Sequence, residues 1–164
     1  NIKNYSDYPK KGILFRDLNP IFRKPELFHL LINYMCEQAN KLGRFDYILG
    51  VEARGFIIAS ALAQNLDCGF VPIRKKGKLP GNTNSVEYDL EYGRDCLEIQ
   101  VDEELENARV LVIDDIFATG GTLNAVLSLL EPITANTCFG VVLDIGISDI
   151  KGLKKDHFVV LDDA

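Results

Sequence analysis

Several residue types that carry common chemistry are rare or missing in this sequence. Tryptophan is absent, and the two histidines, His29 and His157, lie far apart. The four cysteines never form a Cys-x-x-Cys pair, which excludes the spacing typical of a zinc site. No run of about 18 apolar residues occurs, so a membrane-spanning helix is not expected. Walker A and Gly-x-Gly-x-x-Gly motifs are missing as well, which excludes the usual triphosphate and dinucleotide sites.

Positive charge is also in short supply. Eighteen Lys and Arg residues face 24 Asp and Glu residues, for a formal net charge of −6. Nucleic-acid binding depends on a basic surface that neutralises phosphates, so a nucleic-acid partner is not expected. A local cluster of cations can still attract an anion, because the field depends on where the charges lie.

The remaining composition is that of a folded domain. Hydrophobic residues make up 47% of the 164 residues, which is too much for a disordered chain and enough for one core. The scattered cysteines suggest reduced core residues of a cytoplasmic protein. Residues 1–4 contain no apolar segment of a secretory signal, and without an initiator methionine we expect a few native residues to precede them.

Hydrophobic periodicity predicts strands that alternate with helices. We expect residues 1–22 to be irregular, because Pro9, Gly12 and Pro20 interrupt any pattern. Helices are expected over residues 25–42, 55–66 and 123–130, and strands over residues 47–51, 70–73, 97–101, 110–113, 139–143 and 158–161. This alternation predicts an α/β fold with a mostly parallel sheet flanked by helices, in which ligands bind at the carboxyl ends of the strands. The polar region 75–101 predicts a two-stranded hairpin arm or a long loop.

Residues 110–122 carry the clearest chemical signal. Four aliphatic residues predict a buried strand, and Asp114 and Asp115 are expected at its exposed carboxyl end. The turn that follows, residues 118–122, opens the next helix with backbone N–H groups that lack intrahelical partners and suit a phosphate monoester. Adjacent acids would repel that phosphate, unless they accept hydrogen bonds from the hydroxyls of its sugar. The combination therefore indicates a ribose 5-phosphate site.

Two further segments indicate a second anion site. Residues 52–55 follow a predicted strand and precede a helix, so their N–H groups and Arg54 can meet an anion. Four cations then occur within five residues: Arg74, Lys75, Lys76 and Lys78. They stand at the end of a predicted strand, where charge-assisted contacts with phosphate oxygens are strong. Of the four, Lys76 is expected to be merely solvated.

Five blocks appear in a fixed order and carry a resemblance: residues 7–9 with 12–17, 50–56, 73–81, 88–93 and 110–122. They are similar to the blocks of the type I phosphoribosyltransferases, and over nearly the whole chain to the adenine-specific members of that family. The resemblance implies the transfer of a 5-phosphoribosyl group from phosphoribosyl pyrophosphate (PRPP) to adenine, which yields AMP and pyrophosphate. It also implies one domain over residues 1–164, with residues 1–22 as a hood over the base and residues 75–101 as a flexible arm.

The resemblance assigns residues to each part of this site. The implied catalytic residues are Glu91, Asp114, Asp115 and Arg54, with Glu91 as the acid–base group near the purine. The 5-phosphate is implied to lie on Ala118, Thr119, Gly120, Gly121 and Thr122. The pyrophosphate contacts are Glu52, Ala53, Arg54, Arg74, Lys75 and Lys78, in a loop that often contains a non-proline cis peptide. The adenine contacts are Phe15, Arg16 and Ile116, and Tyr88 and Tyr92 belong to the lid.

The family also implies partners. Mg²⁺ is expected to arrive on PRPP, with no direct protein ligand, and the chain is expected to form a homodimer in which Arg74 reaches the neighbouring site. Neither nucleic acid nor a membrane is an expected partner.

Two alternatives remain open. One is a related transferase for xanthine, hypoxanthine or orotate. Against it, hypoxanthine-guanine relatives carry an aspartate in place of Ala118 and a lysine in place of Gly121. The other is a PRPP-sensing regulator without turnover, which the negative net charge and the presence of Glu91 and the cation cluster disfavour.

Overall fold

The structure is a computed structural model that describes residues 2–90 and 93–162. The chain divides into two compact units, Asn1–Tyr34 and Met35–Ala164. Within the described residues, none of the helices has the length and apolar character needed to cross a membrane.

The N-terminal unit begins with a hairpin. Strands β1 (Lys3–Ser6) and β2 (Leu14–Asp17) pair antiparallel, and the short helix α1 (Asn19–Phe22) follows. The expectation of an irregular segment was therefore wrong. Pro9 and Gly12 lie in the connection between the strands, where Gly12 N donates to Asp7 Oδ1 at 2.6 Å and the Tyr8–Pro9 peptide is cis. These residues mark a turn rather than a lack of structure.

Helix α2 (Pro25–Leu42) has the predicted bounds and spans the boundary between the units. It begins with proline, whose missing N–H costs nothing in the first turn. The helix buries Leu31, Met35 and Ala39, as its periodicity requires, whereas Leu30 and Tyr34 are exposed.

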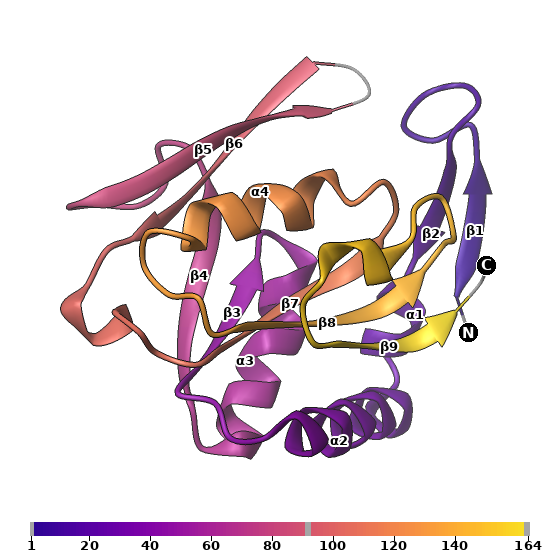
Figure 1. The fold of residues 1–164 in the computed structure, drawn as a ribbon. Coiled ribbons are helices and arrows are strands. Elements are labelled where there is room, and N and C mark those ends of the chain that lie inside the picture. Colours follow the sequence, from indigo (N-terminus) through magenta and orange to yellow (C-terminus); the bar gives the residue numbers. More distant parts are fainter. Residues whose placement is uncertain (1, 91–92, 163–164) are drawn as a thin grey trace. The chain divides into compact units, whose positions relative to one another are not determined.

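The second unit is built on a seven-stranded sheet in the order β5-β6-β4-β3-β7-β8-β9 (Figure 1). The strands are β3 (Tyr47–Val51), β4 (Gly69–Lys75), β5 (Thr83–Leu90), β6 (Gly93–Gln100), β7 (Val110–Phe117), β8 (Thr137–Asp144) and β9 (His157–Asp162). Helices α3 (Arg54–Leu66) and α4 (Gly121–Leu130) connect them, together with short 3-10 turns at Glu103–Leu105 and Ile150–Leu153. Strands β4, β3, β7, β8 and β9 are parallel to one another, and β6 is antiparallel to both of its neighbours, β4 and β5. This arrangement confirms the predicted fold class.

The two helices cover opposite faces of the sheet (Figure 1). Successive residues of a strand point to opposite faces, so Leu49 and Val112 belong to the core under α4, while Ile48 and Ile113 face α3. Both helices begin directly after a strand, α3 after β3 and α4 after β7. Their N-termini therefore meet the carboxyl ends of the central strands at one edge of the sheet.

Several strands are longer than predicted, and two of them extend by four residues at one end. Strand β7 continues beyond Ile113 to Phe117, and β6 begins at Gly93 rather than at Leu97. The polar region after residue 75 thus forms the hairpin, β5 and β6, which we call the arm. Its residues pair over the full length from Thr83–Gln100 to Leu90–Gly93, because paired polar strands satisfy their backbone groups without burying both faces.

Candidate functional site

Asp114 and Asp115, the acid pair, lie inside strand β7 and are 8% and 7% exposed. The prediction of an exposed position at the end of the strand was therefore wrong. The strand extends past the pair and α3 packs against it, which removes both carboxylates from bulk water. Asp115 N donates to Asp114 Oδ1 at 2.9 Å, so the pair is also ordered by its own backbone.

Arg54 joins the acid pair to the start of α3. Its Nε lies 2.5 Å from Asp115 Oδ2, a buried oxygen that receives no hydrogen bond of good geometry from the described residues. Gly55 makes this approach possible, because a Cβ atom there would lie 2.7 Å from the backbone oxygen of Ile113. Any larger residue would push the first turn of α3, and Arg54 with it, away from β7.

The environment of the acid pair favours a bound proton. Burial, and next the negative charge of Asp115, raise the pKa of Asp114 well above its ordinary value. Hydrogen bonding from the Asp115 backbone and the charge of Arg54 act in the opposite direction without cancelling this rise. A carboxyl that keeps its proton can donate as well as accept, which suits a pair of sugar hydroxyls.

The phosphate turn, residues 118–122, follows β7 and leads into α4. Gly120 caps the helix with φ = 80°, a left-handed conformation that glycine adopts without strain. Thr119 is exposed, and Ala118, Gly121 and Thr122 are partly exposed, so a ligand can reach the turn. The first N–H groups of α4 have no acceptor within the helix, which is the feature that phosphate-binding helix N-termini use.

The arm lies over this turn. Strands β5 and β6 both contact α4, and the side chain of Tyr88 on β5 interacts with that of Thr122 on α4. Burial, and next the charge of Asp95, raise the pKa of Tyr88, so its hydroxyl remains a donor at neutral pH. Glu91 and Tyr92, the other residues predicted for the lid, lie outside the described residues.

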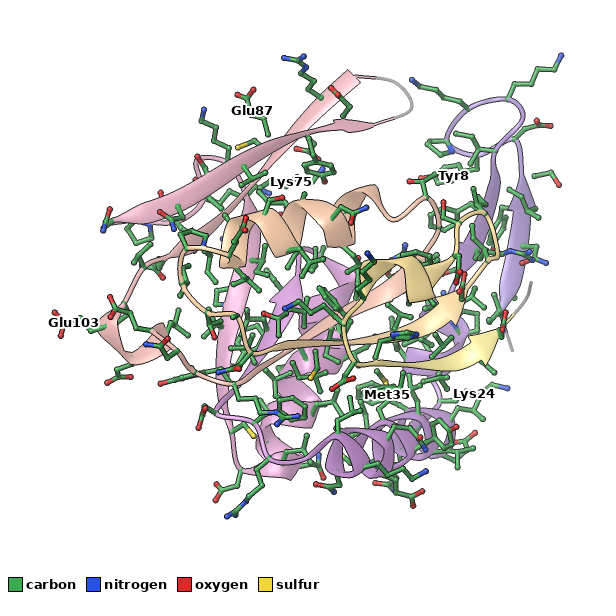
Figure 2. All side chains as sticks on the ribbon, in the orientation of Figure 1. Tyr8, Lys24, Met35, Lys75, Glu87 and Glu103 are labelled. Carbon is green, nitrogen blue, oxygen red and sulfur yellow. The ribbon has the colours of Figure 1, made fainter. Side chains whose placement is uncertain are left out.

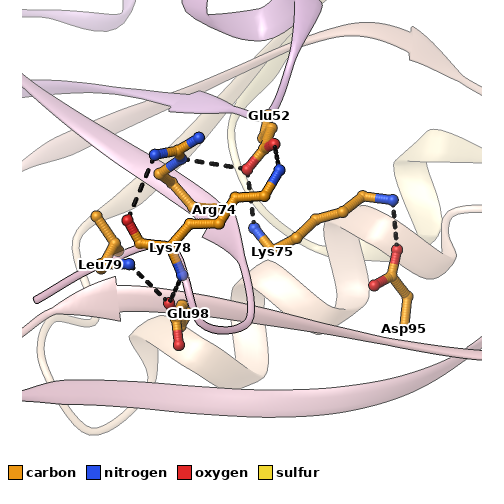
Figure 3. A network of polar contacts seen from close by, with 7 residues as sticks. All are labelled: Glu52, Arg74, Lys75, Lys78, Leu79, Asp95 and Glu98. Atoms are coloured by element: carbon orange, nitrogen blue, oxygen red, sulfur yellow. Dashed lines mark hydrogen bonds and ion pairs between the residues drawn. The ribbon is translucent and has the colours of Figure 1, made fainter.

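The cation loop, residues 74–79, gathers around Glu52 at the end of β3 (Figure 3). Glu52 accepts hydrogen bonds from Arg74 Nε at 3.2 Å and from Lys75 N at 3.0 Å, and it forms an ion pair with Lys78 Nζ. The peptide between Glu52 and Ala53 is cis, which confirms the form implied by the resemblance. Four of the six predicted pyrophosphate residues therefore come together after β3 and at the end of β4: Glu52, Arg74, Lys75 and Lys78.

These contacts keep Glu52 ionised. Burial raises the pKa of this carboxyl, but the bonds from Lys78, Lys75 and Arg74 outweigh burial and hold the pKa below its ordinary value. The negative charge of Glu52 in turn offsets part of the repulsion among the cations. Through these contacts, the Glu52 carboxylate holds the cation loop in place before any ligand binds.

The cations of the loop differ in their contacts with residues other than Glu52. Lys75 reaches the arm, where its Nζ lies 2.9 Å from Asp95 Oδ2 (Figures 2 and 3). The bond raises the pKa of Lys75, and although burial raises the pKa of Asp95, Lys75 holds that pKa below its usual range. The Arg74 guanidinium lies 5.9 Å from the centre of the Phe56 ring. Lys76 is exposed, with its backbone N–H bound to Cys96 O.

The residues predicted for the base lie on separate elements. Phe15 and Arg16 are on β2 in the N-terminal unit, where the Phe15 ring makes an edge contact with Tyr8 at 5.2 Å between centroids. Ile116 is a partly exposed residue of β7, two positions after Asp114.

Two carboxylates of the site are absent from the sequence-based assignment. Asp95 and Glu98 both lie on β6 and bind the cation loop, Asp95 through Lys75 and Glu98 through backbone N–H groups. Glu98 is only 5% exposed, although its neighbours Leu97 and Ile99 are buried as well. The sequence held no direct signal for this, since an acid between two apolar residues ordinarily faces water.

The resemblance implies that Mg²⁺ arrives with PRPP and has no direct protein ligand. Within residues 2–90 and 93–162, no group of three or more His, Cys, Asp or Glu side chains is placed to hold a metal ion. The acid pair could approach a cation only at the expense of its contact with Arg54. Mg²⁺ usually binds substrate phosphates and keeps several waters, and this arrangement leaves room for such a mode.

Comparison with known proteins shows the family of this chain. A family model described as the phosphoribosyl transferase domain matches residues 24–162. The chain belongs to this family. All the elements of the second unit, from β3 to β9, fall inside the matched range, including the acid pair, the phosphate turn and the cation loop.

Individual relatives of this phosphoribosyl transferase are adenine enzymes. The chain is 51% identical over 130 residues to adenine phosphoribosyltransferase from Brachyspira hyodysenteriae, covering 79% of this chain and 76% of that protein. The crystal structure of the Saccharomyces cerevisiae enzyme, complexed with an imino-altritol bisphosphate and adenine, has a TM-score of 0.86 and 38% identity, with 98% and 94% of the chains covered. The Giardia lamblia enzyme complexed with 9-deazaadenine gives 0.90 and 30%, with 99% and 94% covered.

Proposed function

We propose that this phosphoribosyl transferase converts adenine and PRPP to AMP and pyrophosphate, a reaction of purine salvage. The observation that carries the proposal is the joining of three parts at one edge of the sheet. The phosphate turn follows the acid pair on β7, and Arg54 connects the acid pair to the loop that contains Glu52. Each part suits one portion of PRPP: the 5-phosphate, the ribose diol and the pyrophosphate. Relatives solved in complex with adenine or 9-deazaadenine support the choice of base.

The phosphate turn and the acid pair hold the ribose phosphate in this mechanism. The N–H groups of residues 118–122 bind the 5-phosphate, with hydroxyl donors from Thr119 and Thr122. Asp114 and Asp115 bind the two ring hydroxyls. As pyrophosphate leaves, C1 gains positive charge, which the nearby acid pair stabilises in its buried surroundings. Adenine N9 then attacks from the opposite face with inversion.

The leaving group is assigned to the cation loop. Arg74, Lys75 and Lys78 are held at one place by Glu52 and Asp95, so they can bind pyrophosphate with little rearrangement. Arg54 contributes from the side of the acid pair. Mg²⁺, when bound with PRPP, neutralises part of the pyrophosphate charge. The Tyr88 contact with Thr122 supports a lid role for the arm, and the proposal assigns Glu91 and Tyr92 to the same lid.

The adenine contacts that the resemblance assigns are Phe15, Arg16 and Ile116. Glu91 acts as the acid–base group that exchanges a proton with the purine. The whole chain, residues 1–164, acts as one phosphoribosyltransferase domain in this proposal. A cytoplasmic location, supported by the scattered single cysteines, is part of it.

A base panel with PRPP tests the activity. Radiolabelled adenine, hypoxanthine, guanine, xanthine and orotate are incubated separately with the protein, PRPP and Mg²⁺, and nucleotide formation is measured. Adenine should be converted far faster than the others. Preference for an oxopurine or orotate would contradict the proposed base, and PRPP binding without any nucleotide would favour the regulator.

We also propose a homodimer in which Arg74 serves the neighbouring site. Mixing subunits that carry Arg74→Ala with subunits that carry Asp115→Asn tests it after unfolding and refolding together. If Arg74 acts across the interface, a mixed dimer contains one intact site and regains activity. If Arg74 acts within its own chain, as its contact with Glu52 also permits, the mixture stays as inactive as its parts.

A further inference from the structure

Glu98 on β6 stands out as a buried carboxylate for which the proposed reaction has no use. It is the only glutamate among the buried residues of the described chain, at 5% exposure. Its Oε1 accepts the backbone N–H of Lys78 at 3.0 Å and of Leu79 at 3.1 Å (Figure 3). The Gly77 N–H also favours the negative charge of this carboxylate. Three consecutive amides of the cation loop therefore converge on one side chain.

Strand pairing explains why Glu98 can reach these amides. Strands β4 and β6 run antiparallel with Arg74 opposite Glu98 and Lys75 opposite Leu97. The loop turns back after Lys75, with Gly77 at φ = 82°, and passes over Glu98. A carboxylate that accepts several backbone N–H bonds binds them about twice as strongly as a neutral acceptor would. The loop is thereby fixed at residues 77–79.

The consequence reaches the cations. With its backbone tied to Glu98, Lys78 directs Nζ to Glu52 and presents its carbonyl oxygen to Arg74 Nη1 at 3.4 Å. Arg74 in turn contacts Glu52. The position of two cations thus depends on a residue that contacts neither charged group directly.

We propose that Glu98 is a positioning residue for pyrophosphate binding, which holds residues 77–79 so that Lys78 and Arg74 face the leaving group. This inference rests on the proposed function for the identity of the ligand. Burial alone would raise the pKa of Glu98, but the bonds from Gly77, Leu79 and Lys78 hold it below its ordinary value, as expected for a carboxylate that remains ionised at neutral pH.

The test measures each phosphate subsite separately in Glu98→Gln. In the reverse reaction from AMP and pyrophosphate, the KM for pyrophosphate should rise about tenfold or more, because a displaced loop loses well-aligned contacts. The KM for AMP should stay within about twofold, since AMP binds at the phosphate turn. Glu103→Gln is the matched control: Glu103 is exposed and points away from the protein, so both KM values should remain unchanged (Figure 2).

A double variant shows whether Glu98 acts through Lys78. In a Lys78→Ala background, Glu98→Gln should raise the KM for pyrophosphate by less than about threefold, because the side chain it positions is gone. In a Thr122→Ala background, at the 5-phosphate end, the full tenfold effect should remain. Equal effects in both backgrounds would overturn the inference.

A second variant keeps the test valid if Glu98→Gln does not fold. Gly77→Ala strains the same turn from the exposed side, where a new Cβ meets no atom within 4 Å. It should raise the KM for pyrophosphate and leave that for AMP unchanged. A parallel rise of both constants, or a loss of thermal stability with unchanged constants, would mean that Glu98 is only structural.

The outcome can be separated from the proposed function. If the wild-type protein forms no AMP, the function fails, and calorimetric binding of Mg²⁺-pyrophosphate and of AMP still tests Glu98 with the same variants. If the wild-type protein forms AMP but Glu98→Gln binds both ligands normally, only the positioning inference fails.

Discussion

The two ends of the proposed site are built in different ways. The ribose-phosphate end is one continuous stretch, in which β7, the acid pair, the phosphate turn and α4 follow each other along the chain. The pyrophosphate end is assembled from three separate segments: Glu52 directly after β3, the cation loop at the end of β4, and Asp95 and Glu98 on β6. At the ribose-phosphate end, the local design, binding depends on the geometry of one strand and the helix that follows it. At the pyrophosphate end, the assembled design, binding depends on ion pairs between residues that are distant in sequence.

The ends also differ in how their acids titrate. At the ribose-phosphate end, burial raises the pKa of Asp114. At the pyrophosphate end, cations and backbone N–H groups hold the pKa values of Glu52, Asp95 and Glu98 low despite burial. One end therefore tends to keep a proton, and the other keeps its negative charges. The predictions below test this contrast.

The largest expected effect concerns Asp115. Asp115→Asn removes a buried negative charge next to the developing positive charge and leaves Arg54 without its carboxylate partner. We expect kcat to fall by about 10²–10³-fold. Steady-state kinetics with adenine and PRPP measure this, with Asp67→Asn at the exposed far end of α3 as the control that should retain activity. Normal turnover of Asp115→Asn would remove the acid pair from the mechanism.

Gly120→Ala tests the local design directly. The left-handed conformation of Gly120 costs a residue with a Cβ about 1–2 kcal/mol, and the new atom would lie 3.3 Å from the Phe117 ring. We expect a lower melting temperature and a KM for AMP raised by about tenfold, with the KM for pyrophosphate almost unchanged.

The control for this substitution is Gly152→Ala, where a Cβ meets no atom within 4 Å. It should change neither constant. If Gly120→Ala raised the KM for pyrophosphate as strongly as that for AMP, the two ends would not be independent.

Asp114→Asn should increase the stability of the folded protein and lower its enzymatic activity. Because the folded pKa of Asp114 is raised, the unfolded chain releases this proton first, and stability falls as the pH rises above the unfolded value of about 3.9. The asparagine of the variant does not ionise, so the variant does not lose this stability as the pH rises. We expect a gain of about 1 kcal/mol, or about 2–4 °C in melting temperature, at neutral pH.

Thermal unfolding of Asp114→Asn and wild type between pH 4 and pH 8 measures the difference, which should grow with pH. Glu52→Gln provides the opposite sign. Its folded pKa is lowered, so Glu52 contributes stability above the unfolded value of about 4.3 that is lost as the pH falls through the folded value. The Glu52→Gln penalty should therefore shrink toward acid pH. The same trend in both variants would contradict the contrast between the ends.

The smallest effect is expected for Lys75 and Asp95. Their side chains are 53% and 20% exposed, so solvent weakens the ion pair. A double-mutant cycle with Lys75→Met and Asp95→Asn should give a coupling free energy of about 0.2–1 kcal/mol in unfolding experiments, decreasing with added salt. A coupling that exceeds this range and resists salt would show that the arm is held more firmly than its exposure implies.

Sequence reasoning succeeded where the structure is local. The bounds of α2 and β3 follow from hydrophobic periodicity, and the alternation of strands and helices led to the correct sheet. It failed at residues 3–17, where turn residues were taken to exclude strands, and at Asp114 and Asp115, whose burial depends on how α3 packs. The neighbours of a residue along the chain do not reveal what covers it.

By itself, the sequence determined the α/β architecture, the phosphate turn after a buried strand, and the cluster of cations, because each depends on residues within a few positions of one another. Only the tertiary structure decided that Arg54 meets Asp115, that Glu52 gathers the cations, and that Glu98 binds residues 77–79. The physical reason is that these contacts join residues 19 or more positions apart, and their geometry exists only after β3, β4, β6 and β7 have taken their places in the sheet.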